Sequence, residues 1–291
     1  MLLQEKMKST DFSPSERIVV DFILNKQELI QNYTTTTIAS ETYTSPSVLV
    51  RISKKLGFNG YNDLKKAFLE EVLYLKHNFQ NLDANIPFAS KDSIMNIAAI
   101  ITKLKQESLS DTLSLIHHDS LHKAVLFLQK GCTIKVFAIS NLTFLAEEFV
   151  FKLRHIGLKA ETYSISNTLL QEAMMVSAND CAVCISYSGE SPELICVAKT
   201  LKKNHVPIIA ISCVGENSLT RLSNVVLQIA TREKSYSKIG AFTSQESISL
   251  ILDILYSCLF KTDYNRHYAF KTQLSKATEF RLIDNSIIQE E

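Results

Sequence analysis

The spacing of apolar residues changes along the chain. Up to about residue 75, apolar side chains recur at three- and four-residue intervals in short segments, the period of helices that lie against a core. From Gly131 onward, apolar runs of five to seven residues alternate with longer helical stretches. We therefore predict a helical N-terminal part followed by an α/β part.

Capping residues mark the starts of the first helices. Ser13 precedes a proline at the first helical position, and Ile18, Val19 and Phe22 follow on a helical period, which predicts a helix ending near Asn25. Ser45 likewise precedes a proline and predicts a helix that Gly57 ends. Other helical pieces are expected over 28–32, over 36–43 and from Phe58 onward.

Residues 76–91 are polar, contain a proline and have no sustained period, so we interpret them as a linker. Helical patterns follow over 92–117 and 121–129, and the last 30 residues predict a terminal helix with a loose end. The expected divisions are a helix-turn-helix domain over 1–78, a linker and connecting helix over 79–120, an α/β domain over 121–262, and a C-terminal helix and tail over 263–291.

Five apolar runs predict the strands of one sheet. Runs that are apolar on both faces are typical of a parallel sheet covered by helices on both sides, so we predict a three-layer α/β/α sandwich. The strands are expected over 133–139, 160–164, 181–186, 207–212 and 225–229, with helices over 143–156, 167–178, 191–204 and 243–260.

Composition limits the possible functions. With 46% hydrophobic and 21% charged residues, the chain can bury a core and is neither disordered nor collagen-like. A net charge of +1 gives no field that would draw the whole molecule to nucleic acid or acidic lipid, so any basic surface must be local. We find no signal-peptide pattern and no apolar run long enough to span a membrane, and we expect a cytoplasmic protein. Five of the six cysteines lie in apolar runs and are expected to be reduced core thiols.

The segment 36–56 fits a helix-turn-helix whose second helix carries a cationic face. Residues 45–66 hold five cations and one acid, a local charge of +4. We expect Ser45, Ser47 and Arg51 to approach base edges or phosphates of double-stranded DNA. The residues expected to neutralise phosphates are Lys54, Lys55 and Lys65. The alternative is that these cations only solvate an exposed helix face.

The stretch from Ser45 to Lys65, together with Ser13-Pro-Ser-Glu-Arg17, resembles the N-terminal domain of the RpiR family of sugar-responsive bacterial transcription regulators. That family usually has a small residue or glycine near Tyr43 and a threonine near Val48. Because both positions belong to the turn and its base contacts, the resemblance implies a DNA-binding domain and does not supply the operator sequence.

A hydroxyl-rich turn follows the third predicted strand. In an open parallel sheet, ligands bind at the carboxyl ends of the strands. Ser186, Ser188 and Ser191, with Gly189 for close backbone approach, form an anion cradle at a helix start that suits a phosphate and requires neither metal nor cofactor. Ser140, after the first strand, would reach the same region. The alternative is an ordinary capped turn.

Residues 124–260 resemble a sugar isomerase (SIS) domain, a phosphosugar-binding fold, through three motifs. These are Arg154-His-Ile-Gly157, Ser186-Tyr-Ser-Gly-Glu-Ser191 and Thr243-Ser-Gln245. The resemblance implies that hydroxyls at 140, 186, 188 and 191 hold the phosphate. Ala138 stands where the family usually has glycine.

Three functions follow from these patterns. We expect a DNA-binding regulator that binds a phosphosugar, acts as a homodimer or tetramer, and controls genes for sugar uptake or catabolism. The second is a phosphosugar isomerase or lyase, for which the nearby candidate bases are Glu190, Glu193, Glu246 and His205. The third is a binding protein for protein partners. We interpret the CxxC at Cys181 as structural and the histidines at 117–122 as surface residues.

Overall fold

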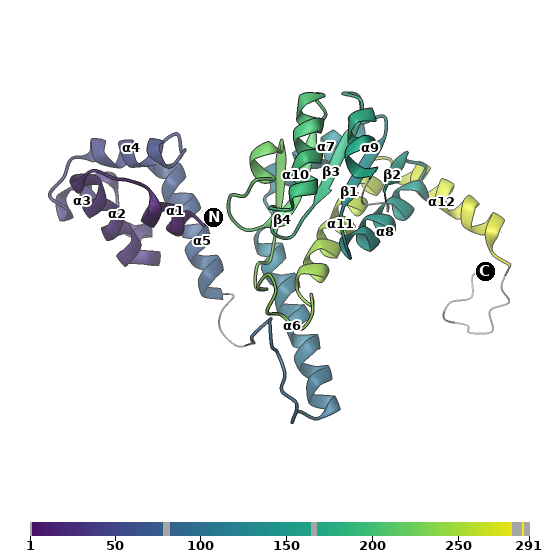
Figure 1. Ribbon diagram of the computed structural model, residues 1–291, viewed down its shortest axis with the longest axis horizontal. Coiled ribbons are helices and arrows are strands. Elements are labelled where there is room, and N and C mark those ends of the chain that lie inside the picture. Colours follow the sequence, from purple (N-terminus) through teal and green to yellow (C-terminus); the bar gives the residue numbers. More distant parts are fainter. Residues whose placement is uncertain (1, 78–81, 164–167, 281–286, 288–291) are drawn as a thin grey trace. The chain divides into compact units, whose positions relative to one another are not determined.

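The computed structural model describes residues 2–77, 82–163, 168–280 and 287 (Figure 1). It forms two compact units. The first consists of Met1–Leu115, Cys213–Asn217 and Ile229–Glu246, and the second of Ile116–Ser212, Ser218–Gln228 and Ser247–Glu291. The domain boundaries drawn from the sequence pattern stay predictions.

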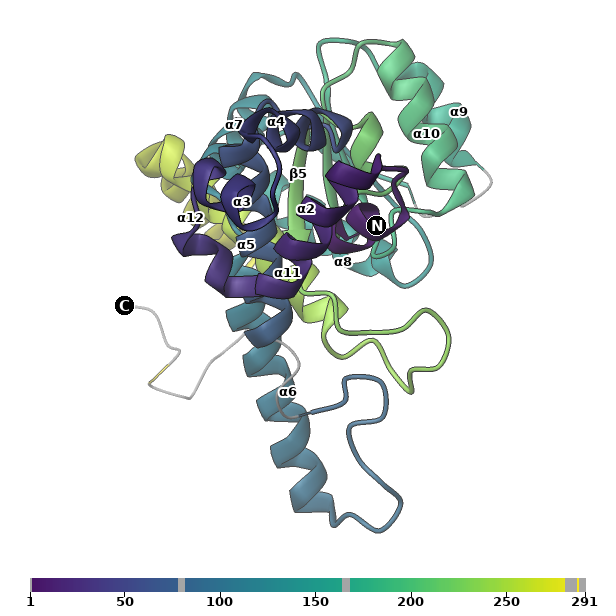
Figure 2. The same ribbon diagram turned by 90° about the vertical axis from the view of Figure 1, so that its left-hand side faces the viewer.

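The N-terminal part is helical, as predicted. Its elements are α1 (Leu3–Ser9), α2 (Pro14–Lys26), the 3₁₀ helix η1 (Gln27–Asn32), α3 (Thr35–Glu41), α4 (Pro46–Lys55) and α5 (Tyr61–His77). The sequence analysis missed α1. Figure 2 shows α2, α3 and α4 beside one another, and their buried faces share one core with α5 that includes Val20, Ile38, Leu49 and Phe68. Burial of these side chains holds short helices that would be marginal in isolation.

Gly57 ends α4 as predicted. Its φ of 93° lies in the left-handed region, the Phe58 amide donates to the Ser53 carbonyl at 2.8 Å, and the Gly57 amide donates to the Lys54 carbonyl at 3.1 Å. This pair of bonds is a Schellman motif, which satisfies the last carbonyls of the helix. At the other end Ser45 holds the predicted N-cap position, but its hydroxyl bonds to that of Ser47 at 2.7 Å and caps no amide.

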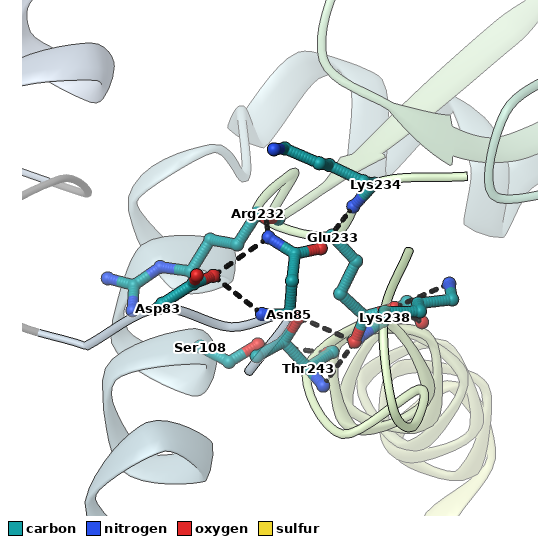
Figure 3. A network of polar contacts seen from close by, with 9 residues as sticks. Asp83, Asn85, Ser108, Arg232, Glu233, Lys234, Lys238 and Thr243 are labelled. Carbon is teal, nitrogen blue, oxygen red and sulfur yellow. Dashed lines mark hydrogen bonds and ion pairs between the residues drawn. The ribbon is translucent and has the colours of Figure 1, made fainter. Parts of the chain in front are cut away.

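The predicted linker is anchored where the structure describes it. Residues 82–93 have no regular structure before α6 (Ile94–Ser114), yet Ala84 and Asn85 are buried. The Asn85 Oδ1 accepts the Lys234 amide at 2.6 Å, and its carbonyl accepts the Ile239 amide at 3.0 Å (Figure 3). The segment is therefore pinned to the loop that precedes α11.

The five predicted strands form one sheet in the order β2-β1-β3-β4-β5. The pairs β1 with β2, β1 with β3, and β3 with β4 are parallel. The strands are β1 (Ile134–Ala138), β2 (Ala160–Thr162), β3 (Cys181–Ile185), β4 (Ile208–Cys213) and β5 (Val225–Ile229). The helices are α7 (His118–Lys130), α8 (Leu142–Arg154), α9 (Leu169–Met175), α10 (Pro192–Lys203), η3 (Thr220–Leu222), α11 (Ser244–Thr262) and α12 (Tyr264–Thr278). The predicted fold class is confirmed.

Helices pack against a sheet that is buried on both faces. Phe137, Ala182 and Ile208 share one core with residues of α9 and α10. Their strand neighbours Val136 and Val183 point to the opposite face and are fully buried as well. Because α8 packs on β1 and β2 without joining the first core, the sheet lies between two helical layers, as predicted.

The cysteines and the C-terminal end differ in part from the expectations. Cys181 and Cys184 are buried as expected, and Cys213 and Cys258 are half-buried. Cys196 is exposed, because it lies on the outer side of the amphipathic helix α10. The predicted terminal helix is α12, whereas the expected loose end falls on 281–291, of which only residue 287 is described. Within the described ranges, we find no helix with the length and apolar character needed to span a bilayer.

Candidate functional site

The outer face of α4 carries the candidate DNA-binding residues. Val48, Leu49 and Ile52 are buried against the helical core, and this fixes which side of α4 faces solvent. Five of the six predicted residues are exposed on or beside α4: Ser45, Ser47, Arg51, Lys54 and Lys55. A short helix with a polar N-terminus and an exposed cationic face can enter a major groove.

Lys65 lies elsewhere. It belongs to α5, and its Nζ donates to the Gln31 and Tyr33 carbonyls, each at 2.8 Å. These bonds tie α5 to the end of η1, so the ammonium group already has a structural partner in the described chain. Any contact of Lys65 with phosphate would have to share this ammonium group.

Two exposed residues near α4 were not among the predicted DNA contacts. Tyr43 is 98% exposed in the turn between α3 and α4, with a φ of 51°, and Val50 on α4 is 42% exposed. Van der Waals contact with a thymine methyl is the chemistry that an exposed valine offers in a groove. The signal that could have found Val50 is an apolar residue on the cationic side of the helical wheel.

Glu16 was not predicted to take part in this site either. This carboxylate on α2 is almost fully buried and lies 2.7 Å from the Lys55 Nζ and 3.6 Å from the Arg51 Nε. The hydrogen bond from Lys55 lowers the pKa of Glu16 to about 2, and the Ser13 amide, which donates at 2.9 Å, adds to the effect against the cost of burial. The Ser-x-x-Glu spacing of a capping box was the available signal.

The second candidate site lies where the chain changes direction across the sheet. From β1 the chain turns toward β2, whereas from β3 it turns toward β4, although β1 and β3 are neighbours. Loops from the two strands diverge at their carboxyl ends, which is the ligand-binding position of open α/β sheets. Ser140 follows β1 and Ser186–Ser191 follow β3. The residues predicted to bind phosphate therefore lie at the same edge of the sheet, at the carboxyl ends of these strands.

Hydrogen bonds shape the loop over 186–191. The buried Ser186 hydroxyl accepts the Gly189 amide at 3.1 Å, and the Ser188 hydroxyl accepts the Glu190 amide at 3.2 Å. Gly189 has a φ of 68°, a conformation that glycine adopts without strain. Ser191 holds the N-cap position of α10 but makes no side-chain capping bond. The first amides of α10, at the positive end of its dipole, are therefore available to an anion.

Ser140 is exposed and has a φ of 56°. Its carbonyl accepts both the amide and the hydroxyl of Thr143, at 3.2 and 2.7 Å. The loop after β1 is thus a compact turn into α8. A φ in this region is one that glycine adopts without strain, so the Cβ of Ser140 adds strain to this turn.

The candidate bases of the isomerase alternative are partly engaged. Glu190 accepts the Ser218 amide at 2.8 Å, and its hydrogen bonds to Ser218 hold the pKa of this carboxylate below its usual value. Glu246 forms an ion pair with Lys105. A carboxylate with a lowered pKa is a weaker general base.

The CxxC at Cys181 and the histidines at 117–122 were interpreted as residues without a redox or metal-binding role. Burial raises the pKa of both Cys181 and Cys184 to about 12, which keeps these thiols protonated and unreactive near neutral pH. His118 stacks on His122 at 5.8 Å between ring centroids. In the described part of the chain, no three histidine, cysteine or acidic side chains are grouped so as to hold a metal ion.

Comparison with known proteins gives two domain matches and full-length relatives. Residues 1–73 match the helix-turn-helix domain of the rpiR family, and residues 126–257 match the SIS domain. An uncharacterized HTH-type transcriptional regulator from Caldanaerobacter subterraneus subsp. tengcongensis is 22% identical over 95% of this chain and 96% of its own length.

Two solved structures share the fold. The Vibrio vulnificus NanR protein complexed with ManNAc-6P is 24% identical, covers 94% of this chain and 97% of its own, and superposes with a TM-score of 0.59. The sugar isomerase domain of an RpiR transcription factor from Sphaerobacter thermophilus is 15% identical, covers 62% of this chain and 98% of its own, and has a TM-score of 0.56. Both domain types occur here in one chain, in the order that the sequence motifs predicted. This chain belongs to the RpiR family of helix-turn-helix transcriptional regulators, with a SIS domain after the helix-turn-helix domain.

Proposed function

We propose that this regulator binds a phosphorylated sugar at the loop over 186–191 and that occupancy changes its affinity for promoters of sugar uptake or catabolism genes. The observation that carries the proposal is the position of this loop, at the edge where the chain diverges from β1 and β3 and where α10 begins without a side-chain cap. The ManNAc-6P complex of the Vibrio relative supports a sugar phosphate as the ligand class.

In this proposal hydroxyls and backbone amides bind the phosphate. Ser186, Ser188 and Ser191 supply hydroxyls, Gly189 allows close approach of the backbone, and Ser140 contributes from the neighbouring loop. The α10 dipole favours the negative charge, so the site needs no metal or cofactor.

On the DNA side, Ser45, Ser47 and Arg51 contact base edges or nearby phosphates, and Lys54, Lys55 and Lys65 contact the backbone. One helix-turn-helix makes few contacts, so specific binding requires at least two copies on a two-fold related site. We propose a cytoplasmic homodimer or tetramer whose DNA-binding and α/β domains are those drawn from the sequence, 1–78 and 121–262.

The sensor site is tested by thermal shift with ManNAc-6P and a panel of hexose 6-phosphates. Ser186→Ala combined with Ser188→Ala should abolish the shift that the cognate sugar phosphate causes in the unaltered protein. Ser177→Ala, a hydroxyl that precedes β3 instead of following it, is the matched control and should keep the shift. A full shift in the double variant would move the ligand to another site.

DNA binding is tested on a promoter fragment from the protein's own gene neighbourhood. Affinity should fall steeply with salt, with a log–log slope of about 0.9 per neutralised phosphate. Arg51→Ala with Lys54→Ala should weaken binding at every salt concentration, whereas Lys261→Ala, which removes an exposed cation of α11, should not. Unchanged binding in the double variant would refute α4 as the reading helix. Turnover of a sugar phosphate would instead favour an isomerase.

A further inference from the structure

A buried carboxylate on α2 lies beneath two cations of α4. The Glu16 side chain is 3% exposed, whereas those of Arg51 and Lys55 are 54% and 43% exposed. Its Oε1 lies 3.6 Å from the Arg51 Nε, and its Oε2 lies 2.7 Å from the Lys55 Nζ. Because the two cations are four residues apart on one helix, a single carboxylate reaches both of them.

The carboxylate itself is held in place. The Ser13 amide donates to Oε2 at 2.9 Å, so Glu16 is part of the capping box that begins α2. The Lys55 Nζ also lies 5.6 Å from the centre of the Phe12 ring, which adds a cation–π contact on the same side. A cation that pairs with Glu16 therefore contacts a carboxylate whose own position is fixed by the start of α2.

The pairing uses one particular edge of the guanidinium group. The Nε of Arg51 faces the Glu16 Oε1 at 3.6 Å, an ion-pair distance longer than a hydrogen bond, and the two terminal nitrogens are the donors that remain for an outside acceptor pair. The O6 and N7 atoms of guanine form such a pair in the major groove. We propose that Glu16 is a positioning residue for DNA recognition, which orients Arg51 through Nε so that its terminal nitrogens meet a guanine edge. This inference rests on the proposed function, because it requires α4 to read DNA.

Two consequences of opposite sign follow. Orientation of Arg51 before binding lowers the entropy lost when the base contact forms, so it strengthens specific binding. The negative charge beside two cations reduces their attraction to any phosphate backbone, so it weakens non-specific binding. Because the charge acts on the phosphates of every duplex, the gain in the ratio of specific to non-specific affinity comes from the orientation of Arg51.

The test measures binding of the full chain to two duplexes by fluorescence anisotropy across a salt series. One duplex is the promoter fragment, and the other has the same composition in shuffled order. Glu16→Gln should bind the shuffled duplex more tightly and with a steeper salt slope, while its preference for the promoter falls about tenfold. Glu16→Asp keeps the charge but shortens the reach, so it should lose preference without gaining affinity for the shuffled duplex.

Glu71→Gln is the matched control. Glu71 is a second buried carboxylate of the same helical part, but it accepts the amides of Leu3 and Gln4 and contacts no cation of α4 among its described partners. It should leave the preference unchanged, and thermal melts show whether each variant is folded at the assay temperature.

The outcomes separate the inference from the proposed function. If the unaltered protein shows no preference for the promoter, the proposed function fails and the inference fails with it. If the unaltered protein prefers the promoter, Arg51→Ala removes that preference, and both Glu16 variants keep it, only the inference is overturned. A loss on both duplexes in parallel would show a purely structural role and would also overturn it.

Discussion

At the residue scale, Glu16 makes the stability of the helical part depend on pH. Its folded-state pKa of about 2 lies below the ordinary value of 4.5, so its contribution is fully present above pH 4.5 and is lost as pH falls toward 2. We expect Glu16→Gln to lower the free energy of unfolding at pH 7 by roughly 1–2 kcal/mol, less than the whole pKa shift implies, because both cation partners are half exposed. Urea titrations at pH 7 and pH 3 check this, and an equal loss at both would contradict it.

Tyr43 offers a prediction of opposite direction. Its side chain is 98% exposed, so removing it costs little packing energy. Its φ of 51° lies in the left-handed region, where a residue with a Cβ is strained. Tyr43→Gly should stabilise the protein by up to about 1 kcal/mol. Tyr43→Ala keeps the Cβ and should gain nothing, so thermal melts in which the two variants behaved alike would rule out this account of the turn.

The limits of sequence analysis are clear from single residues. The cationic face of α4 was predictable, because Arg51, Lys54 and Lys55 follow from helical periodicity. The partners of those cations were not, because Glu16 precedes Arg51 by more than thirty residues and meets it only when α2 packs on α4. The carbonyls that hold Lys65 are likewise invisible until η1 and α5 are brought together.

At the element scale, the start of α11 depends on a distant carboxylate. Glu233 accepts the Thr243 amide and hydroxyl at 2.7 and 2.8 Å, and the Ser244 amide and hydroxyl at 3.0 and 2.7 Å. Lys238 pairs with it at 2.8 Å (Figure 3). Burial alone would raise the pKa of Glu233, but the bonds from Lys238, Ser244 and Thr243 outweigh it, so the pKa is lowered.

We expect Glu233→Ala to fray the first turn of α11. Four donors would lose their acceptor in a buried site, which should cost about 2–4 kcal/mol. Hydrogen exchange should speed up at the amides of Thr243 and Ser244 while the strands stay protected. Lys238→Met is the control, because it removes the Lys238–Glu233 ion pair and keeps the bonds from Thr243 and Ser244. Unchanged hydrogen exchange in Glu233→Ala would refute the capping role of Glu233.

Elements with a local signal were predicted, and α1, which lacks one, was not. The strands β1, β3, β4 and β5 were visible because each is a mostly apolar run, and the end of α4 because Gly57 follows it. The signal for β2 is weaker, because this strand holds Glu161 and Thr162 beside Ala160. α1 has only seven residues and one buried side chain, Met7, so its pattern is too short to reveal a period. The diverging loops after β1 and β3 were predicted as one site because parallel strands bring their carboxyl ends to the same edge.

At the scale of the whole molecule, the segment that follows the DNA-binding helices is held by a buried contact within the first unit. Asn85 is 8% exposed, and it accepts the Lys234 amide while its Nδ2 donates to Asp83 at 2.9 Å. The same loop carries Glu233, the residue that fixes the start of α11. The linker is therefore tied to the loop that sets one helix of the α/β part, although its sequence predicts only a polar connector.

Asn85→Asp tests this anchor with nearly unchanged shape. The new carboxylate would itself be buried and would lie against Asp83, an exposed carboxylate whose pKa is already lowered by the bonds it accepts from Asn85, so a buried negative charge would face a second one. We expect the variant to lose about 2–3 kcal/mol at pH 7 and to be cleaved faster within 82–93 in limited proteolysis. Part of the loss should return near pH 4–5, where the two carboxylates share one proton.

The chain supplies a matched control for this last experiment. Asn96 donates to Asp92 at 3.0 Å in the same chemical arrangement, but at an exposed position on α6. Water screens the two charges there, so Asn96→Asp should change stability by less than about 0.5 kcal/mol at any pH. If both variants lost stability equally, the effect would come from added negative charge alone. A selective, pH-reversible loss in Asn85→Asp would instead show that burial of this contact holds the linker against the loop.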